Sequence, residues 1–534
     1  MLDVLIIGSG GAGLSAALEA RKISSNILVV SKTYPTHSQT VQAQGGINAV
    51  LYEDEDSTQI HSEDTYKASC KVSDLNNIKF LCENAKETIT WLNNLGVPFT
   101  RDKDNKISQR KFGGTKKIRT CYSSDYTGLK IVHTLYDQCI KEDINFMHEH
   151  QLINLIIEES QCIGITTLDI INGEIKELYA KTIIIATGGY AGLYTNNTTN
   201  SYSNTGDGIA AALRAGAKLS NMEFIQFHPT ALENTNILIS ESARGEGGYL
   251  LDKDKKRFID ELKPRDEVAR AIYTKILKNE KVYLDLRHLG KEKIIELMPQ
   301  ERRLAYEFSN IRLEDELLPI NPAAHYSMGG IKVDLNGETS IKNLYAVGES
   351  AQANIHGANR LGGNSLLEIV TLGRVIGKNA SIKSKDIDIN DISINNQLNQ
   401  DKTYIKSLLQ YPNEINFYTK KNTLGSDLYK YLGLFREAKG MKKLHNEILK
   451  IKDSITSMGT SDKSKHYNKN LSEFIEFINI VELAEVLVLS SLHREESRGS
   501  HYRIDFKNED TLLQKNSITY IKDSSLVIEF EDIK

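Results

Sequence analysis

A short apolar run near the start of the chain leads into a glycine-rich turn and a second apolar stretch. Residues 4–7 read Val-Leu-Ile-Ile, residues 8–13 contain four glycines, and residues 14–20 are mostly apolar. A short apolar run bounded by glycine is typical of a buried strand, and the longer stretch favours a helix. Residues 27–30 predict a second strand. The chain therefore begins with the order strand, turn, helix, strand, which indicates an α/β fold.

Buried strands of the same kind return later in the chain. Residues 182–189 are an apolar run that ends in two glycines, and residues 344–349 are another that ends in Glu349. Both predict further strands of the first domain.

The pattern changes after about residue 381 and becomes helical with polar linkers. Residues 424–442 and 471–494 have helix-like apolar spacing. Residues 517–530 alternate between apolar and polar positions around Lys522–Ser525 and predict a hairpin.

At 534 residues the chain is too long for one core, and we expect roughly two to four domains. Residues 227–330 are richer in charge and interrupt the α/β pattern. We predict a discontinuous α/β domain over residues 1–226 and 331–380, with an α+β capping domain inserted over 227–330. A helical domain over 381–510 and a hairpin tail over 511–534 follow.

The glycine-rich turn has the chemistry of a dinucleotide site. Gly8, Gly10 and Gly13 give the pattern G-x-G-x-x-G between a strand and a helix, which predicts a pyrophosphate at the helix N-terminus. The acid expected at the end of the second strand is absent, because Ser31 and Lys32 stand there. Glu349 is a candidate acceptor for ribose hydroxyls. The alternative for the glycine motif is a turn used only for packing. The alternative for Glu349 is a generic buried strand that ends in a solvated glutamate.

A second motif, at residues 356–368, combines an arginine with glycines and a helix start. Arg360 offers a planar, charged fork suited to a carboxylate. Asn364 or Ser365 can cap the helix that follows, and a helix N-terminus suits an oxygen-rich ligand. The alternative is a tight loop whose arginine pairs with a structural carboxylate.

Composition narrows the function classes. The hydrophobic fraction of 40% and charged fraction of 25% are typical of a globular protein, and a net charge of −4 gives no case for nucleic acid. The cysteines form no C-x-x-C pair, so neither a metal site nor an iron–sulfur cluster is indicated, and they suit a reducing compartment. We expect neither a signal peptide nor a direct membrane span.

Longer motifs give the chain a family resemblance. It resembles the flavoprotein subunit of succinate dehydrogenase and fumarate reductase, from about residue 3 to residue 380 and again at residues 496–501. The motifs that carry the resemblance are residues 44–47, 109–114, 204–208, 226–230, 241–248, 264–266, 325–330 and 356–368. The resemblance implies a two-dinucleotide-binding FAD domain with an inserted cap, and the FAD-dependent interconversion of succinate and fumarate.

The resemblance also implies roles at the substrate site. Arg360 and His325 would hold one carboxylate. The other would lie against His228, Thr230 and the backbone at Gly45 and Gly46, with Phe112 in the wall. Arg265 would transfer the proton, with Glu241 and Arg244 as its relay. Residue type alone favours His228 or His325 for that role, because arginine normally stays protonated.

The implied FAD contacts come from the glycine turn and from several strand and helix ends. They are Gly8, Gly10, Gly11, Ala12, Gly13, Ser31, Lys32, Gln39, Thr40, Gln44, Gly45, Gly46, Ala186, Thr187, Gly188, Asp207, Glu349, Asn364, Ser365 and Leu366.

One departure from the family pattern concerns the attachment of the flavin. Members of membrane complexes carry a histidine that bonds covalently to the flavin at the position of Gln39. An amide cannot serve as that nucleophile, and His37, two residues away in an extended segment, would lie about 7 Å from it. We therefore predict non-covalent FAD. A covalent bond raises the flavin potential in such enzymes, so its loss favours fumarate reduction or an oxidase.

L-Aspartate oxidase is the main alternative, since residues 237–244 and 497–502 also resemble it. Aspartate oxidases carry a glutamate at the position of Phe112 to pair with the substrate ammonium. An aromatic wall leaves that charge unpaired at a cost of several kcal/mol. Phe112 thus favours an unsubstituted dicarboxylate.

Electrons must enter or leave through something other than a cluster of this chain, because the chain has no cluster-binding cysteines. The resemblance implies a separate iron–sulfur subunit and, through it, a quinone-reactive membrane anchor. These partners would place the chain in the cytoplasm, peripheral on the inner face of the cytoplasmic membrane. A further alternative is an assembly subunit with no turnover of its own.

Overall fold

The computed structural model describes residues 1–387 and 396–533, and its largest sheet has seven strands. β1 lies between β2 and β9, parallel to both, with Leu5 opposite Leu28 and Ile183. β16 continues the parallel part beside β9, whereas β7 and β8 are antiparallel. The strands are β1 (Leu2–Ile7), β2 (Ile27–Ser31), β6 (Asn145–His148), β7 (His150–Glu158), β8 (Gln161–Asp169), β9 (Ile175–Ile185) and β16 (Leu344–Ala346).

This sheet confirms the strands expected at residues 4–7, 27–30 and 182–189. β16 is shorter than expected, because a 3₁₀ turn, Gly348–Ser350, begins before Glu349. Continuous apolar runs mark strands buried on both faces.

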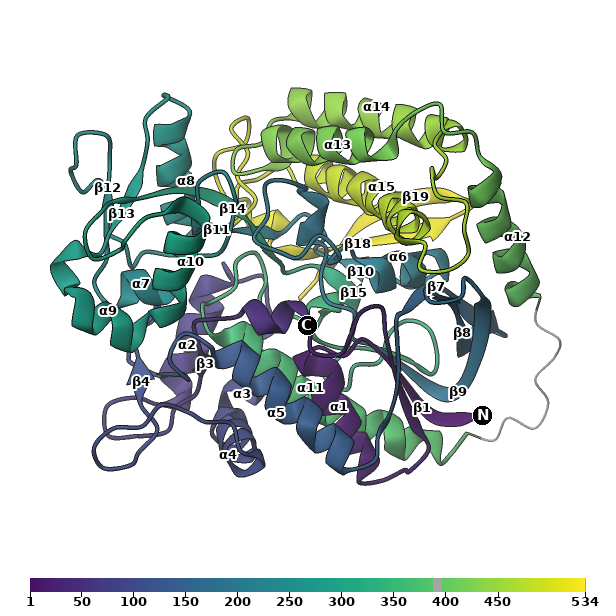
Figure 1. The fold of residues 1–534 in the computed structure, drawn as a ribbon, viewed down its shortest axis with the longest axis horizontal. Helices are drawn as coiled ribbons and strands as arrows, with labels where there is room; N and C mark the ends of the chain where they lie inside the picture. The colour runs from purple at the N-terminus through teal and green to yellow at the C-terminus, as the bar shows by residue number, and fades with distance from the viewer. Residues whose placement is uncertain (388–395, 534) are drawn as a thin grey trace.

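Helices cover the parallel part of the sheet, and α1 and α11 lie side by side in Figure 1. A small sheet joins residues near the cavity described below, with Ile47 opposite Cys121. These elements are α1 (Gly11–Arg21), α2 (Thr58–Ala68), α3 (Leu75–Glu83), α4 (Ala85–Leu95), α5 (Thr127–Lys141), α11 (Asn364–Ser384), β3 (Ile47–Asn48), β4 (Gln109–Arg110) and β5 (Thr120–Cys121).

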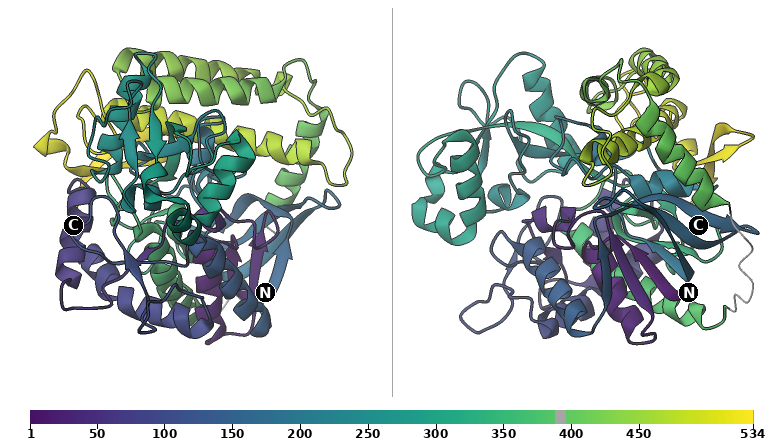
Figure 2. Two further views of the ribbon diagram at one scale, coloured as in Figure 1. Left: turned by 60° about the vertical axis from the view of Figure 1, so that its left-hand side comes forward. Right: turned by 45° about the vertical axis from the view of Figure 1, so that its right-hand side comes forward.

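A separate lobe is inserted between two paired strands, β11 and β14. It has its own apolar core, which includes Ile239, Val268 and Leu284. Figure 2 shows this lobe beside the C-terminal helices and above the α/β core. Its elements are β11 (Ile225–Leu232), α7 (Glu241–Gly245), β12 (Tyr249–Leu251), α8 (Arg265–Ile276), β13 (Tyr283–Asp285), α9 (Lys291–Leu297), α10 (Pro299–Ser309) and β14 (Leu318–Ser327). We refer to it as the inserted lobe; the domain boundaries given above stay a prediction.

The C-terminal part is helical, as expected, and packs on the core through α6 and α15 (Figure 1). Its helices, with α6 from the core, are α6 (Asp207–Arg214), α12 (Gln397–Gln410), α13 (Phe417–Leu432), α14 (Ala438–Ser454) and α15 (Lys469–His493). α15 confirms the helix expected at residues 471–494. A single helix over residues 424–442 is wrong, because the chain breaks between α13 and α14. The buried Arg436 lies in the break and donates to the carbonyls of Gly433 (3.1 Å) and Glu223 (2.8 Å).

The expected hairpin forms from β18 (Lys515–Lys522) and β19 (Ser525–Asp532), and Asp523 and Ser524 make its turn. β18 pairs with β10 (Leu219–Ser220) in a five-stranded sheet that also contains β15 (Gly330–Lys332) and β17 (Ala351–Gln352). Within residues 1–387 and 396–533, no helix is both long and apolar enough to cross a membrane.

Candidate active site

An elongated cavity begins where β1 and β2 end, passes the N-termini of α1 and α11, and reaches the inserted lobe. Most of the predicted site residues line it. They are Gly8, Gly10, Gly11, Ala12, Ser31, Lys32, Gln39, Thr40, Gln44, Gly45, Gly46, Phe112, Ala186, Thr187, Gly188, Asp207, His228, Glu241, Arg265, His325, Glu349, Arg360, Ser365 and Leu366.

Four predicted residues do not line the cavity, and Gly13 and Thr230 are two of them. A Cβ at Gly13 would lie 2.0 Å from the Gly8 carbonyl oxygen, so Gly13 allows α1 to pack against the end of β1. The Thr230 hydroxyl donates to the Ile239 carbonyl (2.8 Å) and is buried. Both act behind the cavity wall.

Asn364 also lies behind the wall. Its amide oxygen is within hydrogen-bond distance of Asn48 Nδ2 (2.9 Å) and His61 Nε2 (3.0 Å), and its own Nδ2 donates to Thr65 (2.9 Å). The cap expected from Asn364 or Ser365 is wrong, because Gly363 is the N-cap of α11 and no side chain caps it. The structure therefore gives Asn364 a role in fixing the start of α11 through its side-chain contacts, and its neighbours Ser365 and Leu366 reach the cavity instead.

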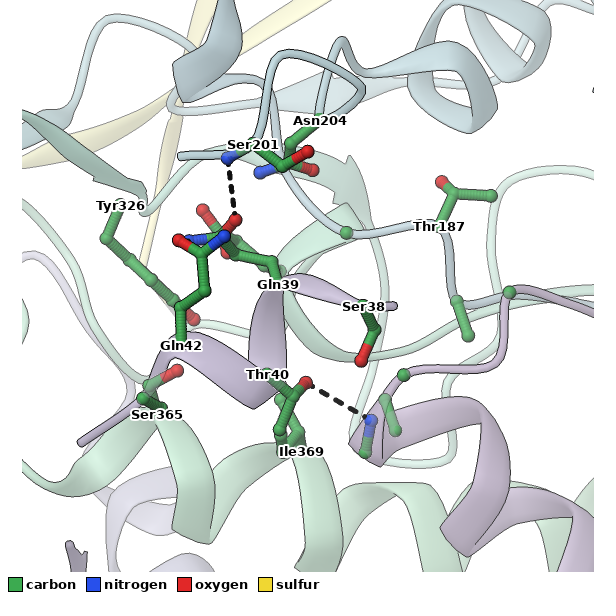
Figure 3. Close-up of a pocket in the computed structure, with 18 of the residues that line it drawn as sticks. Ser38, Gln39, Thr40, Gln42, Thr187, Ser201, Asn204, Tyr326, Ser365 and Ile369 are labelled. Atoms are coloured by element: carbon green, nitrogen blue, oxygen red, sulfur yellow. Dashed lines mark hydrogen bonds between the residues drawn. The ribbon is translucent and has the colours of Figure 1, made fainter. Parts of the chain in front are cut away.

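The glycine turn forms a tight backbone cradle at one end of the cavity, which we call the cofactor end. Gly8 has φ +111°, and a Cβ there would lie 2.2 Å from the Ala186 carbonyl oxygen. The Gly11 N–H at the start of α1 donates to Thr40 Oγ1 (3.2 Å), as Figure 3 shows. A helix N-terminus with exposed backbone suits a pyrophosphate.

Several buried polar atoms at this end have no hydrogen-bond partner among the described residues. Ser38 Oγ, Gln44 Oε1 and Thr187 Oγ1 are buried without a hydrogen-bond partner in the part of the chain that the structure describes, and all three residues line the cavity. Buried polar groups are normally paired. The residues present therefore fit an oxygen-rich dinucleotide such as FAD.

Lys32 at the end of β2 is neutralised by two carboxylates. Its Nζ lies 2.6 Å from Asp207 and 2.7 Å from Glu476. Burial lowers the pKa of Lys32, but the two carboxylates outweigh it and raise that pKa overall. Sequence reasoning selected Lys32 and Asp207 but missed Glu476, because α15 lies more than four hundred residues away along the chain.

Glu349 also lines the cavity. Its Oε1 accepts from the Ser327 N–H (2.9 Å) and hydroxyl (3.0 Å), and burial raises the pKa of its carboxyl to about 7.

Gln39 begins a short 3₁₀ turn, Gln39–Gln42. Its Oε1 accepts from the Ser201 N–H (2.9 Å) and its Nε2 donates to Gln42 (3.3 Å), so the side chain joins this turn to the loop around Ser201 (Figure 3). His37 lines the same cavity.

Two buried arginines meet at the other end of the cavity, which we call the substrate end. Gln226 joins them, since its Oε1 accepts from Arg265 Nη1 (3.0 Å) and Arg360 Nη2 (3.1 Å). Gln226 was not among the predicted site residues, although its motif was recognised. Its amide N–H groups donate to Asn359 (2.8 Å) and to the Arg360 carbonyl (2.7 Å), which fixes the orientation of the oxygen.

Arg360 lacks a carboxylate partner among the described residues, and its Nε has no hydrogen bond there. The guanidinium lies over the Tyr326 ring at 4.3 Å. Burial, followed by repulsion from Arg265, lowers the pKa of Arg360 to about 10. This arginine is therefore charged, buried and open to an anion.

Arg265 pairs with Glu241 from α7. Its Nε and Nη2 lie 2.8 and 2.5 Å from Glu241 Oε2, and the Gly113 N–H donates to Oε1 at 2.9 Å. Burial raises the pKa of Glu241, but Arg265 and Arg244 outweigh it and lower that pKa overall.

Arg244 lies on the far side of Glu241 from Arg265 and does not line the cavity. Its Nη2 is 3.9 Å from Glu241 Oε1, and its Nη1 donates to the Glu261 carbonyl (2.6 Å). The three side chains form a continuous row from the cavity into the inserted lobe.

The two histidines at this end are neutral. The rings of His228 and His325 lie 4.9 Å apart, and burial followed by nearby arginines lowers the pKa of each well below the usual value. His228 Nδ1 contacts the Thr230 carbonyl (3.0 Å), and His325 Nδ1 contacts the Thr199 hydroxyl (2.8 Å). The Nε2 atom of each ring can donate or accept a hydrogen bond, depending on the tautomer.

Phe112 is 2% exposed and lies against Gly45 in the cavity wall. Its ring gives this part of the cavity an apolar face between the charged groups.

Comparisons with known proteins cover nearly the whole chain. Residues 3–366 match the family model described as FAD binding domain, and residues 421–534 match the one described as fumarate reductase flavoprotein C-term. The 8-methylmenaquinol:fumarate reductase flavoprotein subunit of Wolinella succinogenes is 38% identical, with 99% of this chain and 90% of the relative covered.

The succinate dehydrogenase flavoprotein subunit of Coxiella burnetii is 35% identical, with 98% of this chain and 95% of the relative covered. A chain in a solved structure of quinol-fumarate reductase with menaquinol is 32% identical and superposes with a TM-score of 0.96, covering 100% of this chain and 98% of that one.

Proposed function

The chain belongs to the fumarate reductase and succinate dehydrogenase flavoprotein family of FAD-dependent oxidoreductases, and we propose that its cavity interconverts fumarate and succinate with the residues assigned below. The observation that carries the assignment is Arg360, a buried and charged guanidinium without a carboxylate partner among the described residues. A substrate carboxylate would supply that partner.

The substrate end offers donors for both ends of a four-carbon dicarboxylate. We assign Arg360 and His325 to one carboxylate, and His228 with the backbone at Gly45 and Gly46 to the other. Holding both ends fixes the reacting carbons in place, and orientation of this kind contributes several kcal/mol to catalysis.

Arg265 is the proposed proton donor for fumarate reduction. FAD, when bound, supplies the hydride. The row Arg265, Glu241, Arg244 offers a route by which Arg265 can recover its proton, since Glu241 lies between the two guanidiniums. The neutral His228 and His325 are better suited to orienting the substrate than to storing a proton.

Phe112 supports fumarate over aspartate. A substrate ammonium beside this buried ring would find no free carboxylate, because Glu241 is already paired with Arg265, and an unpaired buried charge costs several kcal/mol. The test is turnover of fumarate with reduced viologen against turnover of aspartate with oxygen. We expect turnover of fumarate and none of aspartate. Substantial aspartate oxidation would contradict the assignment.

We also propose that FAD is held without a covalent bond, because Gln39 has an amide where attachment needs a nucleophile. The Gln39 side chain is engaged with Ser201 and Gln42 instead. Acid precipitation should release the flavin into the supernatant. A precipitate that keeps its yellow colour would contradict this.

A separate iron–sulfur subunit and a quinone-reactive membrane anchor are the proposed electron partners. The names of the relatives above, a menaquinol:fumarate reductase and a quinol-fumarate reductase, support this assembly. The chain would then lie on the inner face of the cytoplasmic membrane through its partners. Purification from native membranes should recover these partners with the chain.

A further inference from the structure

A buried cluster joins the inserted lobe to the core directly behind the substrate end. Glu301, at the start of α10, is fully buried and faces Asp125 and Arg110 of the core. No step of the proposed reaction uses these three residues.

Hydrogen bonds tie α10 to the core at this point. Asp125 Oδ2 accepts from the N–H groups of Gln300 (2.6 Å) and Glu301 (3.1 Å), and so caps the helix from the other lobe. Glu301 Oε1 accepts from the Ser242 hydroxyl (3.1 Å), next to Glu241. The cluster thus links α10, α7 and the core.

Arg110 carries this link to the cavity wall. Its Nε donates to the Gly45 carbonyl (2.9 Å) and its Nη2 donates to the Ser124 carbonyl (2.9 Å). Gly45 lines the substrate end. Arg110 Nη1 and Glu301 Oε2 are both buried and unpaired within the described residues.

We propose that Glu301 is a positioning residue for the substrate site: the bonds from the start of α10 to Asp125 form a joint between the inserted lobe and the wall that Arg110 holds, and a charge on the buried Glu301 carboxyl loosens this joint. The proposal rests on the function proposed above, because the joint aligns Arg265 and Glu241 of the lobe with Gly45 and Phe112 of the core.

Electrostatics support a neutral Glu301. Burial, followed by Asp125, raises the pKa of Glu301 well above its usual value, although Arg110 opposes the shift. The N-terminus of α10 suits the negative charge of Asp125, and two carboxylates in one buried site favour sharing one proton. The titratable and charged groups around the cluster are Asp125 and Tyr126 from the loop before α5, Arg110 from β4, Tyr122 after β5, Glu246 after α7 and Arg303 on α10.

The sign of the pH dependence follows from the raised pKa of Glu301. The pKa of Glu301 is at the ordinary value of a glutamate when the joint is open and above that value when the joint is closed. Between these two values, closing the joint takes up one proton. Closing therefore weakens as pH rises, by up to about tenfold per pH unit.

The test compares the wild type with Glu301→Gln, which is neutral at every pH and similar in size. Fumarate KM and kcat are measured from pH 6 to pH 9 with reduced viologen. Wild-type KM should rise relative to the variant by up to about tenfold per pH unit, while the ratio of kcat values stays flat. Glu307→Gln, on the exposed side of the same helix, should follow the wild type. A KM ratio that does not change with pH would overturn the proposal.

Hydrogen exchange separates failure of this proposal from failure of the proposed function, because it needs no substrate. The amides of residues 300 and 301 donate to Asp125. Their protection in the wild type should fall relative to Glu301→Gln as pH rises. Equal protection of these amides in the wild type and the variant at every pH would contradict the proposed joint, even if the enzyme is active. The expected fall in protection would support the joint, even if the protein does not turn over fumarate.

Discussion

The cofactor end and the substrate end of the cavity are built in different ways. Backbone groups and glycines dominate the cofactor end, and much of it comes from residues 8–12 and 38–44. Charged and polar side chains dominate the substrate end, where Arg265, Gln226 and Arg360 come from three separate segments. A backbone cradle is therefore encoded locally, whereas the charged cluster exists only after the inserted lobe packs on the core.

The two ends also balance their buried charge differently. Lys32 at the cofactor end has two carboxylate partners within the protein. At the substrate end Glu241 pairs with Arg265, and Arg360 has no carboxylate among the described residues. The charge of Lys32 is therefore structural and already compensated, whereas the charge of Arg360 would be compensated by an anionic ligand.

The sharpest way to break the cofactor end alone is Gly8→Ala. The new Cβ would lie 2.2 Å from the Ala186 carbonyl oxygen at a φ of +111°. We expect loss of bound FAD and a large fall in Tm, measured by flavin absorbance and calorimetry. Gly96→Ala is the matched control, because Gly96 has φ +106° but nothing within 4 Å. Equal flavin content in the two variants would contradict the account.

Arg360→Gln should break the substrate end and leave the cofactor end intact. Loss of a buried guanidinium that binds a carboxylate should lower kcat/KM for fumarate by about 100-fold to 1,000-fold, with flavin content unchanged. Arg374→Gln is the control, since Arg374 lies on the outer part of α11 and pairs with Glu19 and Glu87. If both variants lost activity equally, Arg360 would have no special role.

A smaller effect should appear in stability at low pH. His228 and His325 stay neutral in the folded protein, so the unfolded chain binds more protons than the folded one below pH 6.5. The unfolding free energy should fall as pH drops, by up to about 1.4 kcal/mol per pH unit for each histidine. Replacing both by glutamine should flatten the decline. The part due to His61 and His501, whose pKa values are also lowered, should persist. An unchanged slope would contradict neutral histidines at the substrate end.

Local patterns predicted the fold well where local forces decide it. The strands at residues 4–7 and 27–30, the glycine turn and the C-terminal hairpin all follow from short apolar runs and turn residues. The division between α13 and α14 could not be predicted this way, because Arg436 turns the chain through contacts with Glu223, far away in sequence.

The site shows the same limit. The glycine turn is readable as a dinucleotide motif, and Arg360 is readable as a carboxylate ligand. Arg265 entered only through the family resemblance, since an arginine is not an evident proton donor. Glu476 and Gln226 were missed because their roles depend on which segments meet in space. Asn364 was expected in the cavity, but its place in the buried network with Asn48 and His61 depends on a side-chain direction that the motif does not encode.

The central claim is that the side chains of the substrate end bind the dicarboxylate and transfer the proton, while the cofactor end only holds the FAD that supplies the hydride. Arg265→Ala tests this claim most directly when flavin content and fumarate turnover are measured on the same preparation. We predict wild-type flavin content and a fall in turnover of at least about 1,000-fold. Turnover near that of the wild type would contradict the account.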